Sequence, residues 1–542
     1  MNHNRIFFLL AITTVVSLVS CGRQTNDGKA IFRYNESAGV STLNPAFAKD
    51  QAIIWTTSQL YNGLVRLDTA LKIQPCLAKR WTISDDGKIY TFTLRDDIYF
   101  HKNPLFNNND STRKVVADDF VYSLNRIIDP KVASPGLWIF SHLAADGFSA
   151  PNDSTFVLKL KEPFAPMLSL LSMPYCSVVP REVVEHYGTD FRSHPCGTGP
   201  FRFQYWKEGV KLVLRRNDNY FERDSNGRSL PYLDAVAVTF IIDKQTAFLE
   251  FIKGNLDFMN SLDASYKDEI LTRTGQLKKK YADRIDMISI PFLNTEYLGF
   301  NMEETGKASK LIRQAINYGF DRRKMMKYLR NNVGEPGCKG MIPCGLAPYD
   351  SLSRYGYDYN PEKARELLVA AGYPGGKGLQ AITLSTTSSY LDICKYIQQQ
   401  LDLIGITIKI DVNPPAALRE QIAQGKSSWF RGSWIADYPD AENYMTLFYS
   451  PNHAPAGPNY TRYSSPKVDR LYEKALKETD ESKRALLYRQ MDSIVMEEAP
   501  VVVLYYDQIL HFTHKNVSGI RTNAMNALDL HYARITYSKN GK

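Results

Sequence analysis

The chain has 542 residues, 44% of them hydrophobic, which is enough for two or three cores but too long for a single one. It carries 66 Lys and Arg against 57 Asp and Glu, a formal net charge of +9. This excess is mild on so large a surface, so the charge balance does not indicate nucleic acid binding.

The first twenty residues have the pattern of a signal peptide. One positive charge, Arg5, precedes an apolar stretch at 6–19 that is shorter than the ~20 residues of a membrane-spanning helix. The stretch ends in Leu18-Val19-Ser20-Cys21, which resembles a bacterial lipobox. We therefore expect residues 1–20 to be removed, Cys21 to be acylated, and residues 21–30 to form a tether for an extracytoplasmic protein. The alternative is an ordinary secretory signal with an incidental cysteine.

The first half of the mature chain is rich in strand patterns. Alternating runs on either side of Asp86-Gly87, within residues 81–95, predict a β-hairpin. A helix is predicted over residues 118–128, because its apolar residues lie on one face and Asp129-Pro130 ends it.

In the second half, predicted helices alternate with predicted strands. Asn360 and Pro361 begin a helix that runs to residue 371, and further helices are predicted at 390–403 and 416–424, with strands at 406–412 and 429–437. Helices at 468–477 and 483–497 and a buried strand at 501–506 follow. This order predicts a mainly parallel or mixed sheet covered by helices, and so an α/β fold of two lobes separated by a strand-rich insertion.

Six cysteines remain in the mature chain besides Cys21, and an exported compartment permits disulfides. Cys338 and Cys344 flank a loop-like stretch, so we expect them to form a disulfide. Cys176 and Cys196 lie on either side of one expected helix and are candidates for a second. Zinc is the competing interpretation, but no histidine or further cysteine lies near either pair at ligand spacing, and no metal site is expected.

The segment Trp429-Phe-Arg-Gly-Ser-Trp-Ile-Ala-Asp437-Tyr-Pro-Asp440 combines two tryptophans, an arginine and an aspartate in an apolar strand that breaks into a turn. Asp437 is expected at the end of the strand, where ligand contacts are common. The alternative is that the tryptophans belong to the core and Asp437 only caps the turn.

Several segments together indicate a family. They are residues 60–68 (Leu60-Tyr-Asn-Gly-Leu-Val-Arg-Leu-Asp68), 77–95, 116–126, Gly197-Thr-Gly-Pro-Phe-Arg202, 311–318, 360–373 and Ala499-Pro-Val-Val-Val503. In this order they resemble the family 5 solute-binding proteins of ABC importers, the oligopeptide- and dipeptide-binding proteins and their relatives. The resemblance covers nearly the whole mature chain.

The resemblance implies a periplasmic-binding-protein-like fold of class II, with three lobes and a ligand cleft between two α/β lobes. Lobe I would combine residues 31–60, 190–293 and 512–542; lobe II would be the insertion 61–189; lobe III would be 294–511. Lobes I and III would close on the ligand by hinge motion. The polar stretch 103–113, where the family has a tight turn, is expected to be a surface loop away from the ligand.

In peptide-binding relatives the segment Arg-x-x-Trp-x-Ala-Asp carries the specificity, and here it is Arg431-Gly-Ser-Trp434-Ile-Ala-Asp437. The resemblance implies that Asp437 pairs with the α-ammonium group of a peptide, since a carboxylate in a cleft that excludes water binds a cation through a charge-assisted hydrogen bond. Trp434 would pack on the ligand. Arg431 would neutralise the peptide's C-terminal carboxylate or, alternatively, be the structural partner of a carboxylate in the protein.

Two further contacts are implied. An extended segment around Gln51 and Ala52 would hydrogen-bond the peptide backbone as an added strand. Trp138 is a candidate wall of the side-chain pockets, with the core of lobe II as the alternative.

The chain lacks a Gly-x-Ser-x-Gly elbow, a His-Glu-x-x-His motif and a phosphate loop, so neither catalysis nor a cofactor is expected. The leading hypothesis is a monomeric, lipid-anchored receptor that delivers short peptides to the permease of an ABC importer. One alternative is the same fold with another ligand, such as a metal chelate, an oligosaccharide or an opine. The other is an extracytoplasmic hydrolase.

Overall fold

The computed structural model describes residues 28–263, 266–307, 309–349, 351 and 355–537. The predicted signal peptide and Cys21 lie outside the described residues. Within the described ranges, no helix is long and apolar enough to cross a membrane. We keep the names lobe I, lobe II and lobe III for the residue ranges given above, whose boundaries remain a prediction.

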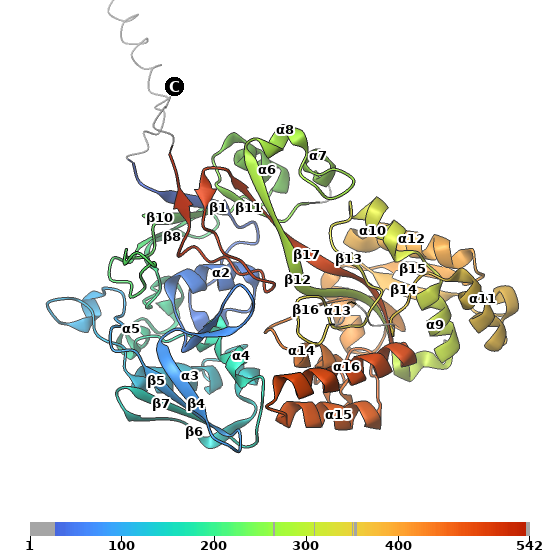
Figure 1. Cartoon of the computed structure of the whole chain (residues 1–542), viewed down its shortest axis with the longest axis horizontal. Coiled ribbons are helices and arrows are strands. Elements are labelled where there is room, and N and C mark those ends of the chain that lie inside the picture. The colour runs from blue at the N-terminus through green and yellow to red at the C-terminus, as the bar shows by residue number, and fades with distance from the viewer. Residues whose placement is uncertain (1–27, 264–265, 308, 350, 352–354, 538–542) are drawn as a thin grey trace, which may run out of the picture.

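A single mixed sheet extends through lobes I and III (Figure 1). Its strands, in spatial order, are β15 (Ile408–Val412), β14 (Ile382–Thr386), β16 (Trp429–Ile435), β12 (Ile285–Phe300), β17 (Val501–His514), β11 (Phe258–Asn260), β1 (Ile31–Asn35), β10 (Ala235–Thr239), β9 (Lys211–Arg216) and β8 (Phe201–Lys207), with β13 (Glu335–Pro336) paired to β17. β14 is parallel to both β15 and β16, whereas β12 is antiparallel to β16 and β17. The mixed sheet predicted from the sequence is therefore present.

Lobe II has a sheet of its own, β4 (Ala78–Ile83), β5 (Ile89–Leu94), β7 (Thr155–Leu160) and β6 (Leu143–Asn152) in spatial order. The predicted hairpin is the antiparallel pair β4 and β5. Two small pairs complete the strands, β2 (Val65–Leu67) with β3 (Ile73–Pro75) and β18 (Val517–Ser518) with β19 (Arg534–Ile535).

Helices surround these sheets. Lobes I and II contain α2 (Gln51–Leu60), α3 (Ala117–Ile128), α4 (Met167–Leu171), α5 (Arg181–Tyr187), α6 (Lys244–Lys253), α7 (Lys267–Ile270) and α8 (Lys279–Ala282). Lobe III contains α9 (Lys310–Tyr318), α10 (Arg322–Leu329), α11 (Pro361–Ala370), α12 (Leu391–Asp402), α13 (Pro415–Ala423), α14 (Glu442–Met445), α15 (Pro466–Lys477) and α16 (Glu481–Glu498). The helices predicted in lobe III, and α3 in lobe II, all form within two residues of their predicted ends.

Side chains at the helix starts explain where these helices begin. Asp50 accepts a hydrogen bond from the Ile53 backbone N–H at 3.1 Å and so caps α2. Asn360 caps α11 in the same way, with Pro361 at the first helical position.

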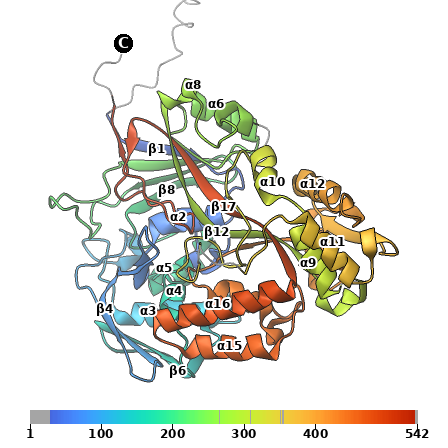
Figure 2. The same cartoon turned by 45° about the vertical axis from the view of Figure 1, so that its right-hand side comes forward.

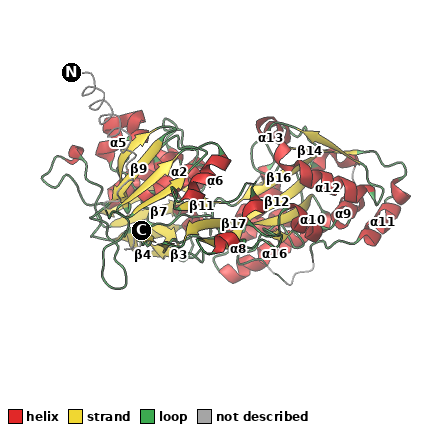
Figure 3. Ribbon diagram, turned by 90° about the horizontal axis from the view of Figure 1, so that it is seen from above, coloured by secondary structure: helices red, strands yellow, loops and turns green. Residues whose placement is uncertain are grey.

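Two long strands connect the halves of the molecule. β12 pairs with β17 along nearly its whole length, and Figure 3 shows both strands passing from one half to the other. The register shifts between Pro291 and Thr295, so the crossing contains a bulge. Within it, the Leu293 N–H donates to the Ala524 carbonyl at 2.8 Å, and the Leu293 carbonyl accepts from the Ala436 N–H at 2.9 Å. The crossing is thus bonded both to the C-terminal segment and to the end of β16.

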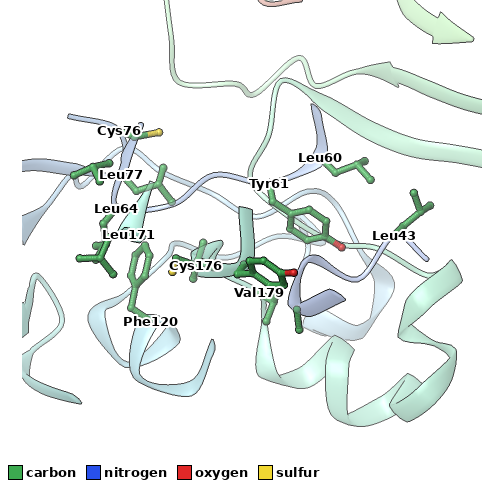
Figure 4. Packing of buried hydrophobic residues seen from close by; sticks show 14 of the residues in the cluster. Leu43, Leu60, Tyr61, Leu64, Cys76, Leu77, Phe120, Leu171, Cys176 and Val179 are labelled. Atoms are coloured by element: carbon green, nitrogen blue, oxygen red, sulfur yellow. The ribbon is translucent and has the colours of Figure 1, made fainter. Parts of the chain in front are cut away.

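The cores lie on both faces of the sheet. In β16, Trp429 packs into the cluster under α9 to α12, while the next residue, Phe430, packs into the cluster beneath α14 to α16. Lobes I and II share one large cluster, in which Leu64, Phe120 and Leu171 meet (Figure 4). Lobes I and II therefore share a core, to which lobe III contributes Tyr438.

The predicted disulfides do not form, and all six described cysteines are free. The Cys176 thiol donates to the Leu170 carbonyl at 3.6 Å, and the Cys196 thiol donates to the His101 carbonyl at 3.4 Å. Each of these two thiols therefore has its own backbone carbonyl as hydrogen-bond partner in the core. Both predictions were wrong, because closeness in sequence, or around one helix, did not bring the thiols together.

The thiols of Cys338 and Cys344 have different surroundings. Burial raises the pKa of both thiols. The charges of Arg322, Asp358 and Arg323 act on Cys338, whereas that of Glu335 acts on Cys344. The two side chains therefore face different neighbours across the loop.

Candidate functional site

A cavity of about 610 Å³, which we call the main cavity because Asp437 faces it, lies between lobe III and lobes I and II. On one side it is lined by α2, by residues 61–69 and by residues 521–532 of the C-terminal segment. On the other side it is lined by Asp437, Tyr438 and Pro439, directly after β16. Its volume lies within the roughly 300–1,000 Å³ of small-molecule sites, and such sites commonly form between domains.

Asp437 brings a carboxylate to this cavity. Its backbone N–H donates to the Asn443 side-chain oxygen at 3.2 Å, which fixes the turn. The side chain is exposed to the cavity although protein surrounds it. This desolvation raises the pKa of the Asp437 carboxyl, and a hydrogen bond with the Asn443 side chain lowers it in part. Among the described residues no ion pair involves Asp437, so the site presents a carboxylate without a cation.

Trp434 and Trp138 line a second cavity of about 620 Å³, which lies between lobes II and III. The Trp434 indole N–H donates to the Asn443 side-chain oxygen at 3.0 Å, the same oxygen that holds Asp437. Trp138 is 41% exposed and stacks on Tyr438, with 6.0 Å between ring centroids. The structure thus places Trp138 at the cavity wall and not in the core of lobe II. Asp437 and Tyr438 line both cavities.

Arg431 does not line either cavity. Its guanidinium forms an ion pair with Glu296, whose side chain is only 3% exposed, and it lies 3.3 Å from the centroid of the Tyr390 ring. The role of ligand partner expected for Arg431 is therefore not supported. The alternative, a structural partner of a carboxylate, describes its surroundings.

Gln51 and Ala52 are in the first turn of α2 and not in an extended segment. The Ala52 carbonyl accepts from the Thr56 hydroxyl at 2.9 Å, and the Gln51 amide donates to the Asn526 carbonyl at 3.3 Å. A helical backbone uses its polar groups within the helix, so it offers no free strand edge. The prediction of an added strand here was wrong; α2 instead presents Ile54, Trp55, Ser58 and Gln59 to the main cavity.

Arg521 lines the main cavity and was not found from the sequence. Its side chain is exposed, and its guanidinium lies 3.6 Å from the centroid of the Tyr532 ring. Among the described residues no ion pair involves Arg521, whereas Arg66 in the same cavity pairs with Glu222 at 2.6 Å. The main cavity thus has an unpaired carboxylate from lobe III and an unpaired guanidinium from lobe I.

Lobes II and III also touch beside the second cavity, where Figure 2 shows α15 and α16 next to α4 and β6. The Ala165 N–H donates to the Leu476 carbonyl at 3.0 Å, and the Lys477 ammonium lies 3.6 Å from Glu162. Tyr438 is 4% exposed and belongs to the core shared by lobes I and II, although it comes from lobe III. These contacts describe lobes that are closed on the cavities.

One predicted absence, that of a metal site, and one predicted loop concern the surroundings of the site. In the described part of the chain, no cluster of three or more His, Cys, Asp or Glu could hold a metal ion. No residue of the polar stretch 103–113 lines either cavity. There the Arg113 guanidinium pairs with Asp119 at 2.7 Å, and the Phe106 ring stacks on Phe100 at 6.1 Å.

Lobes joined by two crossing strands around a ligand-sized cavity are the architecture of a solute-binding protein. The family model for bacterial extracellular solute-binding proteins, family 5 (middle), matches residues 72–456, and the chain belongs to this family. Members of the family are extracytoplasmic, and they serve ABC importers.

The relatives agree with this assignment. The chain is 27% identical over 485 residues to the glutathione-binding protein GsiB of Salmonella typhi, covering 88% of this chain and 89% of the relative. The periplasmic binding protein DppA of Helicobacter pylori, solved with the peptide STSA, is 25% identical with a TM-score of 0.75, covering 94% of this chain and 98% of that one. Both relatives are named as binding proteins, and the chain's family is one of solute-binding proteins, so the chain is not an enzyme and the hydrolase alternative is excluded.

The ligands of similar folds differ. AgaA of A. tumefaciens R10, solved with agropinic acid, is 23% identical with a TM-score of 0.72, covering 94% of this chain and 99% of that one. At this identity the likeness shows the fold alone. The ligand of the present chain has to be argued from its own cavity.

Proposed function

We propose that this chain is a lipid-anchored receptor that captures short peptides, as a monomer, and delivers them to the permease of an ABC importer. The observation that carries the peptide proposal is the Asp437 carboxylate, which faces the main cavity with no cation partner among the described residues. Leaving such a group unpaired in a closed cleft is costly, so the site favours a ligand that brings an ammonium group.

Arg521 supplies the complementary charge. A peptide with free ends is a zwitterion, and its carboxylate would meet the Arg521 guanidinium while its α-ammonium meets Asp437. Asp437 comes from lobe III and Arg521 from lobe I, so the ligand would bridge two lobes that the crossing strands β12 and β17 connect. Both contacts to one ligand require the lobes to be closed, so binding would shift the conformational equilibrium toward the closed form.

The relatives support a ligand of this kind, since one is named for binding glutathione and another was solved with a peptide. An opine, a metal chelate or an oligosaccharide is the second candidate class. An opine can carry the same two charges, and agropinic acid is the ligand of one similar fold. An oligosaccharide has no ammonium group and would leave Asp437 unpaired.

The ligand itself is the test of this proposal. The protein is purified without unfolding from cells grown on a peptide-rich medium, denatured, and the released small molecules are identified by mass spectrometry. We expect a mixture of short peptides, and a marked reduction of the amount released from Asp437→Asn. Release of a sugar, an opine or a metal complex, and no peptide, would overturn the proposal.

The lipid anchor is a separate part of the proposal. It depends on the tetrad Leu18-Val19-Ser20-Cys21 at the end of a short apolar stretch. A Cys21→Ser variant is expected to leave the membrane fraction in detergent partitioning, while its peptide binding is unchanged. Retention of this variant in the membrane would mean that the anchor lies elsewhere.

A further inference from the structure

The second cavity adjoins the proposed ligand site and has a chemistry of its own. It shares Asp437 and Tyr438 with the main cavity, so a group held at Asp437 stands at the boundary of the two. A peptide amine there would let the main chain run through the main cavity toward Arg521. A side chain close to the amine would then extend into the second cavity.

The walls of the second cavity are acidic. Carboxylates reach it from both sides, namely Glu162, Asp437, Glu442 and Glu473, and the one lysine is Lys477. Lys477 and His142 both lie close to Glu162, at 3.6 and 3.3 Å, so the positive groups are gathered at a single carboxylate. The other three carboxylates have no cation partner in an ion pair among the described residues.

The three carboxylates without a cation are held by neutral donors. Glu442 is 5% exposed and accepts hydrogen bonds from the hydroxyl groups of Tyr438 and Tyr472. Glu473 is exposed and accepts from the Tyr449 hydroxyl at 3.1 Å. Neutral donors orient a carboxylate without cancelling its charge. Burial raises the pKa of the Glu442 carboxyl to about 7, so Glu442 carries only part of its charge at neutral pH, and the negative potential of the cavity comes mainly from the exposed Glu473.

Aromatic rings form much of the remaining wall. Trp138, Trp434, Tyr438, Tyr449 and Tyr472 all line the cavity. Aromatic faces attract cations, most strongly those of tryptophan, and they also cover the apolar stem of a long side chain. The carboxylates and the aromatic rings that line this cavity therefore both favour a positively charged group.

We propose that the second cavity is a subsite for a positively charged side chain of the ligand, a lysine or arginine near the peptide's amino end. This inference rests on the proposed function, because the α-ammonium at Asp437 sets the starting point of the side chain. The cavity of about 620 Å³ exceeds any single side chain and so leaves room for water. It therefore discriminates by charge more than by shape, and the preference is moderate.

The test compares tripeptides that differ only in charge. Lys-Ala-Ala, norleucine-Ala-Ala and Glu-Ala-Ala, and the same three side chains at the second position, are titrated into the full-length protein by calorimetry. At one of the two positions we expect lysine to bind about three- to tenfold tighter than norleucine, and glutamate to bind weakest, as screened charge interactions produce.

Variants connect the effect to this cavity. Glu473→Gln removes an exposed charge, so it leaves the core untouched, and it is expected to weaken the lysine peptide about two- to fivefold without changing the norleucine peptide. Glu481→Gln, which removes an exposed carboxylate of the neighbouring helix α16 outside the cavity, is the matched control and should change neither.

The possible failures are distinguishable. Equal binding of lysine and norleucine peptides at both positions would overturn the subsite and leave the Asp437 proposal standing. Equal losses in Glu473→Gln and Glu481→Gln would assign the preference to the overall field of the protein and also overturn the subsite. If no peptide binds at all, the proposed function and the subsite are both wrong.

Discussion

Arg431 and Glu296 provide a direct test of whether a residue in the family's specificity segment is structural in this chain. Arg431→Met removes the guanidinium but keeps an apolar stem beside Tyr390. The Glu296 Oε1 atom keeps its three donors, the Asn294 amide at 3.1 Å, the Ser433 hydroxyl at 2.9 Å and the Tyr390 hydroxyl at 3.5 Å. The Oε2 atom loses Arg431, the one partner the structure gives it in the described residues.

The expected loss of unfolding free energy follows from the hydrogen-bond partners that Glu296 keeps. Breaking a buried ion pair by removing one partner costs about 3–5 kcal/mol. Because Oε1 remains bonded, we expect Arg431→Met to lose about 3 kcal/mol of unfolding free energy. The double variant Glu296→Gln/Arg431→Met removes the stranded charge as well, and it should recover most of the loss.

The assay is urea unfolding followed by tryptophan fluorescence, with peptide binding measured in parallel. Folded Arg431→Met should bind a peptide and its C-terminal amide in the same ratio as the wild type. If its stability is unchanged, and it alone loses the preference for a free carboxylate, then Arg431 contacts the ligand and the structural interpretation is refuted.

Two further predictions concern the interior of the molecule. In folded protein, iodoacetamide should modify the half-buried thiols of Cys338 and Cys344 before the buried thiols of Cys76, Cys176, Cys196 and Cys394. If Cys338 and Cys344 react only after reduction, they form a disulfide and this prediction is wrong. Asp492 is 1% exposed, and burial raises the pKa of its carboxyl to about 7, so the folded state holds a proton that the unfolded state releases near pH 4. The contribution of Asp492 to wild-type stability is therefore lost as pH rises from 4 to 7, so the stability of Asp492→Asn relative to wild type should grow over that range by up to about 4 kcal/mol in urea unfolding. A difference independent of pH would contradict this.

The sequence located the elements whose signals are local. Asn360 and Pro361 predicted the start of α11, which is confirmed. The turn after Ala436 predicted that Asp437 would end a strand; in the structure β16 ends at Ile435 and Asp437 follows two residues later. β17 was predicted to stop at Tyr506 because the apolar run ends there. In the structure it continues to His514, since Asp507 and Gln508 lie at the crossing between lobes, where polar side chains are only half-buried.

The parts of the site that were missed depend on contacts between distant segments. Arg521 belongs to no motif, and it becomes a candidate only because its segment folds back beside α2. Gln51 was assigned to a strand by position within the family, although Asp50 is a good helix cap and begins α2 there. The sequence could not show whether Arg431 contacts the ligand or has a structural role, because its partner Glu296 is 135 residues away.

The most direct test of the central claim is the affinity of the protein for a peptide with and without its free amine. Calorimetry compares tri- to pentapeptides with their N-acetylated forms, on the wild type and on Asp437→Asn. We predict that acetylation weakens binding to the wild type by about 2–5 kcal/mol, the cost of leaving one partner of a buried charge pair, and has little effect on Asp437→Asn. Equal affinity of the wild type for both forms would contradict the account, because Asp437 would then not recognise the amine.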